Sequence, residues 1–110
     1  MIQVVFERND NNSIHTFTMS GHAEAAERGK DLVCAGASAV SFGAVNAIAE
    51  ICDVRLDVEM KGEGGFLRCR VPEKLKLDTY EKVQILLEGL FYSLKTLEEQ
   101  YGQFIRITNN

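Results

Sequence analysis

Hydrophobic and polar residues alternate in two stretches near the start of the chain. Residues 1–8 (MIQVVFER) carry apolar side chains at alternate positions, the pattern of a β-strand with one buried face, and residues 13–20 (SIHTFTMS) are predicted as a second strand with His15, Phe17 and Met19 on one face. Between them stands NDNN at 9–12, and Asn and Asp favour turns because they tolerate left-handed backbone and bond their own chain. The pattern predicts a β-hairpin, and strict alternation places His15 on the same face as Phe17.

A second alternating pair lies in the middle of the chain. Residues 54–60 (VRLDVEM) and 66–71 (FLRCRV) flank the glycine-rich turn KGEGG, so they predict a second hairpin. Alternation puts Cys69 on the apolar face of its strand, where a free cysteine packs as a small hydrophobic residue.

Two longer stretches repeat their apolar residues with helical spacing. The first covers 35–52 and is rich in Ala, Ser and Gly, which suits a buried helix with close neighbours. The second begins near Asp78, carries one apolar stripe, and ends before Gly102; FIRIT at 104–108 then adds a short strand. The order ββ-loop-α-ββ-α-β predicts one α+β domain over residues 1–110, a mixed β-sheet of two hairpins plus a C-terminal strand, packed with two main helices.

Composition narrows the function classes. The net charge of the 110 residues is −4 and the twelve Lys and Arg are scattered, which is not the basic stripe of a nucleic-acid surface. No apolar run approaches the roughly 20 residues that span a bilayer, and the N-terminus does not resemble a signal peptide. The three cysteines are widely spaced and form no disulfide framework, so we expect a protein of the reducing cytoplasm.

Cys34 differs from the other two cysteines in its context. It stands where an irregular segment ends and the predicted helix 35–52 begins, so its sulfur is expected near a helix N-terminus. Unpaired N–H groups and the helix dipole favour a thiolate there, and the thiolate is the nucleophilic form. The N–H groups of Ala35 and Gly36 would stabilise an oxyanion, and Gly36 would let a substrate chain approach closely.

His22 follows Gly21 at the point where the second predicted strand ends. It would form a catalytic pair with Cys34 if the intervening chain brings the two together, although a helix-capping cysteine and a surface histidine fit the same spacing. Asp31 would orient His22, cap the helix or bind substrate. Ser38 lies one helical turn after Cys34 and would either donate a hydrogen bond to the site or permit close packing.

The segment between these residues, 23–33, is expected to be a solvated loop that closes on substrate, with Gly29 as its hinge. We expect no metal site, because the chain has only two His and three Cys and no closely spaced ligand pair. We also expect no cofactor, because a cysteine that attacks a peptide bond and carries the acyl group on its own sulfur needs none.

Taken together, these residues resemble the signature of a known family. Nine positions within eighteen residues fit the pattern G-H-A…G-x-D-x-V-C-A-x-x-S of the ribosomal-processing cysteine protease family, called Prp: Gly21, His22, Ala23, Gly29, Asp31, Val33, Cys34, Ala35 and Ser38. The similarity also covers the length, the opening hairpin, the helical segment and the long C-terminal helix.

The resemblance implies a bacterial cytoplasmic endopeptidase that removes a short N-terminal extension from large-subunit ribosomal protein number twenty-seven. It implies Cys34 as the nucleophile, His22 as the general base and acid, and Gly21, Asp31 and Ser38 as supporting residues. It also implies a homodimer that binds the extension as a peptide substrate. From charge and hydropathy, we expect no direct binding of nucleic acid or membrane. The alternative is a non-catalytic, ribosome-associated binding module.

Overall fold

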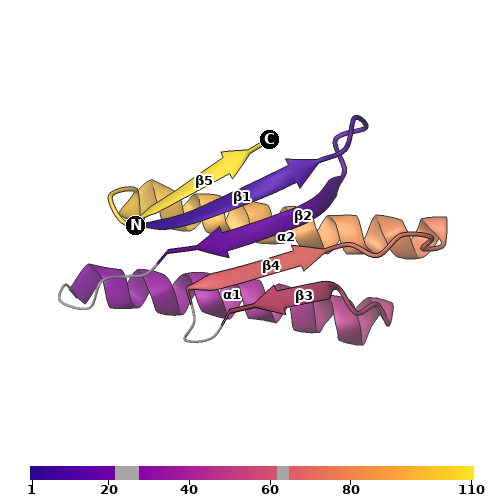
Figure 1. Ribbon diagram of the computed structural model, residues 1–110, viewed down its shortest axis with the longest axis horizontal. Helices are drawn as coiled ribbons and strands as arrows, with labels where there is room; N and C mark the ends of the chain where they lie inside the picture. The colour runs from indigo at the N-terminus through magenta and orange to yellow at the C-terminus, as the bar shows by residue number, and fades with distance from the viewer. Residues whose placement is uncertain (22–27, 62–64) are drawn as a thin grey trace.

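In the computed structural model, which describes residues 1–21, 28–61 and 65–110, five strands and two long helices follow one another along the chain (Figure 1). Their bounds are β1 (Ile2–Arg8), β2 (Ile14–Ser20), α1 (Arg28–Cys52), β3 (Asp57–Met60), β4 (Phe66–Arg70), α2 (Leu77–Tyr101) and β5 (Ile105–Asn109). The predicted fold class, two hairpins and a C-terminal strand with two helices, is therefore confirmed.

The strands form one mixed sheet in the order β3-β4-β2-β1-β5. The predicted hairpins are the antiparallel pairs β1–β2 and β3–β4, and β2 pairs antiparallel with β4. The closing strand β5 runs parallel to β1. This order leaves β3 and β5 at the two edges of the sheet.

Both helices lie on one face of the sheet, and the core fills the space between them (Figure 1). One-sided burial follows from alternation in the strands and from the apolar stripe of α2. The fully buried or nearly buried side chains of β1 and α2 are Ile2, Val4, Phe6, Val83, Leu87, Leu90 and Leu94.

A β-bulge in β2 departs from the predicted alternation. Glu7 pairs with Thr16 but Arg8 pairs with Ile14, so His15 has no partner of its own in the ladder. The prediction that His15 shares the face of Phe17 is wrong, because Ile14 takes the core position and is fully buried.

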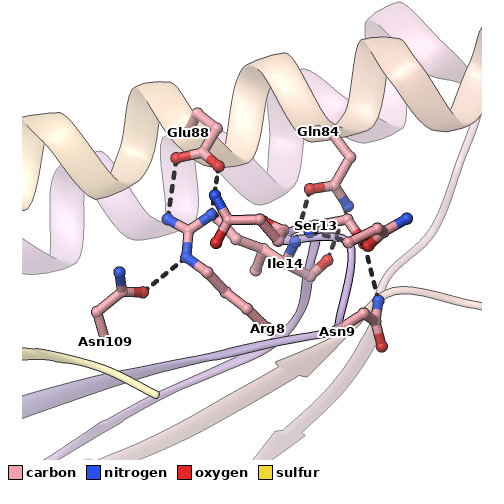
Figure 2. A network of polar contacts seen from close by, with 9 residues as sticks. Arg8, Asn9, Ser13, Ile14, Gln84, Glu88 and Asn109 are labelled. Carbon is pink, nitrogen blue, oxygen red and sulfur yellow. Dashed lines mark hydrogen bonds and ion pairs between the residues drawn. The ribbon is translucent and has the colours of Figure 1, made fainter.

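Polar contacts from α2 hold the bulged hairpin in place (Figure 2). The Gln84 amide accepts a hydrogen bond from the N–H of Ile14 and donates one to its carbonyl, both at 2.7 Å. Arg8 forms a two-pronged ion pair with Glu88, at 2.5 and 3.0 Å, and also donates to the side chain of Asn109 at 2.7 Å. These contacts tie α2 to the hairpin and to β5.

Helix α1 begins at Arg28 and is therefore longer than the predicted helix 35–52. By length and composition, its segment Leu32–Cys52 is long and apolar enough to cross a membrane, so the expectation that no run reaches this length is wrong. Core helices of soluble proteins pass the same test when they are mostly buried; here Val33 and Ile48 are fully buried, but only 22% of the apolar window is.

Candidate active site

Cys34 lies inside α1 rather than at its start. The helix begins six residues earlier, at Arg28, which places Cys34 about 9 Å along the helix axis from its first residue. The N-terminal dipole acts mainly within the first turn. The prediction that Cys34 sits at a helix N-terminus is therefore wrong, because the chain is already helical from residue 28 and not irregular up to residue 33.

The same helix occupies the N–H groups that were expected to hold an oxyanion. In an α-helix each backbone N–H bonds to the carbonyl four residues earlier. The N–H groups of Ala35 and Gly36 lie beyond the first turn of α1, so they are committed to the helix. The predicted oxyanion site at 34–36 is therefore not available in this structure.

Cys34 is partly buried and packs against the edge of the hydrophobic core. Positions four and seven residues later in a helix share its face, so Ser38, also partly buried, and Ser41 lie on the same side of α1. Ser41 is fully buried, and its hydroxyl lies 3.9 Å from the sulfur of Met19 in β2. The face of α1 that carries Cys34 is thus directed toward β2. The contact of Ser41 with Met19 could not be predicted from the sequence, because it forms only when α1 packs on the sheet.

The end of β2 and the beginning of α1 lie at the same end of the molecule (Figure 1). Residues 22–27 connect them and lie outside the described residues, so the predicted base His22 has no described position relative to Cys34. Gly29 is the second residue of α1, and the prediction that it belongs to an irregular loop is wrong. Asp31 is also in α1, and its side chain lies outside the described part of the structure.

Gly21 has a well-defined structural role beside His22. Its φ of +99° is rarely adopted by residues with a side chain, and a Cβ built on it would lie 2.2 Å from the carbonyl oxygen of Met1. Its N–H donates to the carbonyl of Gly65 at 3.0 Å. Glycine is therefore the residue that fits where β2 ends against the start of the chain, at the position that precedes His22 in the sequence.

Gly36 faces away from Cys34. A Cβ on Gly36 would meet the two methyl groups of Leu97 at 3.6 and 3.7 Å, so this position faces α2. Two residues of α-helix turn the chain by about 200°, which separates it from the face of Cys34. The prediction that Gly36 lets substrate approach the cysteine is therefore wrong, and Ala35 is exposed.

The two remaining cysteines have structural positions. Cys69 is 1% exposed in β4, and burial raises the pKa of its thiol to about 12. Cys52 is the last residue of α1 and is partly buried. Within residues 1–21, 28–61 and 65–110, no group of three or more His, Cys, Asp or Glu side chains is placed to hold a metal ion.

Comparison with known proteins gives consistent matches over the whole chain. The family model for the cysteine protease Prp matches residues 1–106. The ribosomal processing cysteine protease Prp of Bacillus subtilis (strain 168) is 41% identical over 110 residues, which is 100% of this chain and 98% of that protein.

Two crystal structures of an essential ribosomal processing protease Prp from Staphylococcus aureus share the fold over 100% of both chains. The structure in complex with a substrate peptide has a TM-score of 0.88 at 36% identity. The structure in complex with a covalently linked product peptide has a TM-score of 0.87 at 37% identity. The family suggested by the signature around Cys34 is confirmed: the chain belongs to the Prp family of cysteine proteases.

Proposed function

We propose that this cysteine protease removes the short N-terminal extension of large-subunit ribosomal protein number twenty-seven during ribosome maturation, with Cys34 as its nucleophile. The family membership and the relatives named for ribosomal processing support the substrate class. The Staphylococcus aureus relative, crystallised with a covalently linked product peptide, supports a covalent mechanism. The observation that carries the assignment is the position of Cys34, partly buried on the α1 face directed toward β2, in the helix that begins at the end of the molecule where β2 ends.

The environments of the three thiols favour Cys34 over the others. Cys69 is sealed in the core, and with a pKa of about 12 it carries almost no thiolate near neutral pH. Cys52 ends α1, about 27 Å along the helix from Cys34 and away from the end of β2. Of the two partly buried thiols, Cys34 is therefore the one in the half of α1 that begins at the end of the molecule where β2 ends.

The reaction is thiol acyl transfer. His22 accepts the proton of the Cys34 thiol, and the thiolate attacks the carbonyl carbon of the scissile peptide bond. The C–N bond breaks as His22 returns the proton to the leaving amine, and a thioester remains on Cys34. Water, activated by His22, then hydrolyses this thioester and releases the extension.

Asp31 and Ser38 lie three positions before and four positions after Cys34 in α1, so both positions share its face. We assign them to positioning the catalytic pair and the substrate. Gly21 supports the site through the backbone, because its conformation sets the path into His22.

We also propose that the protein acts in the cytoplasm as a homodimer. The three cysteines are all free thiols, which agrees with a reducing compartment. Helix α2 carries large exposed apolar side chains that a second copy would cover, Leu77, Ile85 and Tyr92. Sedimentation velocity across a range of protein concentrations tests the dimer, and a monomer throughout would contradict it.

A cleavage assay tests the proposed function. A synthetic peptide carrying the extension, taken from the ribosomal protein of the same genome, is incubated with the protein and followed by mass spectrometry. The parent and a Cys52→Ala control should cleave it at one bond, while Cys34→Ala and His22→Ala should not. Cleavage by Cys34→Ala at the parental rate would refute the nucleophile, and ribosome binding without cleavage by the parent would favour a binding module.

A further inference from the structure

A hollow of about 440 Å³ lies at the other end of the sheet. It is formed where β2 begins and β4 ends, by the connection 71–76 and by the start of α2. These segments lie in Figure 1 at the end of the sheet opposite to the beginning of α1, and α1 contributes no residue to the hollow. Its volume falls within the range of about 300–1,000 Å³ typical of small-molecule sites. It is therefore a separate site from the one that contains Cys34.

The bulge in β2 brings His15 into this hollow instead of the core. Bulges often redirect a side chain beside a binding site. The Nδ1 atom of His15 lies 2.8 Å from the hydroxyl of Thr16, whose exposed fraction is only 5%. When that hydroxyl donates to Nδ1, the neutral ring carries its proton on Nε2, which is then a donor for a ligand.

Two cations line the hollow beside the histidine. Arg8 and Arg68 are paired with Glu88 and Glu59, whereas Arg70 has no ion-pair partner among the described residues. Lys74, also in the lining, is likewise unpaired within that part of the chain.

Among the described residues that line the hollow, Glu73 is the one carboxylate. Lys74 has a φ of +66°, a left-handed conformation that is unfavourable for a lysine and that tends to occur at ligand-binding positions. Asp57 stands opposite Arg70 in the β3–β4 ladder and shares a smaller neighbouring hollow with it, outside this lining. Within the lining itself, Arg70 and Lys74 outnumber Glu73, so its net charge is positive.

The remaining wall is apolar and aromatic. Val71, Pro72 and Leu75 come from the connection between β4 and α2, and Tyr80 comes from the first turn of α2. A ligand that matches this lining has an anionic group at one end and a flat apolar part at the other.

We propose that this hollow binds a small ligand that carries a phosphate group and a planar ring joined through a linker, as the ribose joins the phosphate to the base in a nucleoside monophosphate. Arg70, Lys74 and His15 hold the phosphate, and the ring lies against Tyr80. Three donors from separate segments suit the three terminal oxygens of a phosphate better than the two of a carboxylate. The site is independent of peptide cleavage, and its failure would leave the proposed protease function untouched.

Chemical-shift titration of the ¹⁵N-labelled full chain with adenosine monophosphate tests the proposal. The expected result is saturable shifts at residues 14–16 and 70–75, with a dissociation constant of about 0.1–1 mM. Arg70→Gln should weaken binding about tenfold, because it removes a charge-assisted hydrogen bond from an exposed side chain that has no described partner. Arg55→Gln is the matched control, since Arg55 is exposed and lies outside the hollow, and it should bind as the parent does.

Inorganic phosphate and adenosine separate the two halves of the ligand. Each should bind more weakly than adenosine monophosphate at the same residues. Adenosine binding as tightly as the monophosphate would overturn the role of the cations. No saturable shift up to about 5 mM, or equal weakening by Arg70→Gln and Arg55→Gln, would overturn the site itself.

Discussion

Replacing Gly21 with alanine tests how the chain is directed into the candidate active site. At a φ of +99° the new side chain adopts an unfavourable backbone conformation, which costs about 1–3 kcal/mol. The added Cβ would also lie 2.2 Å from the Met1 carbonyl oxygen, so the first residues or the end of β2 must move. We expect Gly21→Ala to lower the free energy of unfolding by about 2–4 kcal/mol in all.

Gly43→Ala is the matched control for this substitution. Gly43 lies within α1, and a Cβ there would meet nothing within 4 Å. Alanine is the better helix former by about 0.5–1 kcal/mol, so this variant should be as stable as the parent or slightly more stable.

Urea unfolding at fixed protein concentration measures both variants. Peptide cleavage below the unfolding transition shows whether Gly21→Ala also slows the reaction while folded, as expected if it redirects the chain toward His22. Gly21→Ala within about 0.5 kcal/mol of the parent would refute the reasoning, because neither the backbone cost nor the clash would then exist.

Three further predictions concern the framework. Arg8→Met and Glu88→Met should each lower the free energy of unfolding by about 2–3 kcal/mol, because the Arg8 side chain is only 8% exposed and either single change leaves a charge unpaired. The double variant should lose less than the sum of the two single losses. Additive losses in urea unfolding would contradict this prediction. Cys69 should resist iodoacetamide near neutral pH until the protein is unfolded, since its thiol is buried with a pKa of about 12; labelling in the native state would contradict its placement. Burial tends to raise the pKa of Glu98, but hydrogen bonds from a lysine and a backbone N–H outweigh burial, so the pKa is lowered. The carboxylate therefore stabilises the fold above its unfolded pKa of about 4.5, and this stabilisation is lost as the pH falls through the folded pKa. A stability difference between the parent and Glu98→Gln that stays constant from neutral to acidic pH would contradict this prediction.

Periodicity predicted most of the fold because the sheet is buried on one face only. Alternating apolar residues in β1 and the apolar stripe of α2 are direct consequences of this arrangement. The bulge at His15 could not be predicted, since it depends on Gln84, which is distant in sequence and bonds the backbone of Ile14. The start of α1 at Arg28 could not be predicted because Gly29 is a poor helix former. In the structure, burial of Val33 supports this first part of the helix.

The candidate site was predicted as a set of residues but not as a geometry. The signature predicted Cys34 as the nucleophile and correctly identified the family, and the helical spacing correctly placed Ser38 on the face of Cys34. The role of Gly36 was misread because its neighbour Leu97 lies in the other helix. Likewise, the close approach of Gly21 to Met1 arises only when β1 and β2 pair, so no local sequence pattern predicts it.

Trapping the covalent intermediate tests the central claim most directly. The protein is mixed with the peptide carrying the ribosomal extension and quenched in acid within the first turnover. Intact mass and proteolytic mapping then locate the acyl group. We expect a thioester on Cys34 that adds the mass of the released extension less one water, absent from Cys34→Ala and unchanged in Cys52→Ala. Cleavage with the acyl group on Cys52 or Cys69, or with no acyl-enzyme while Cys34→Ala remains active, would contradict it.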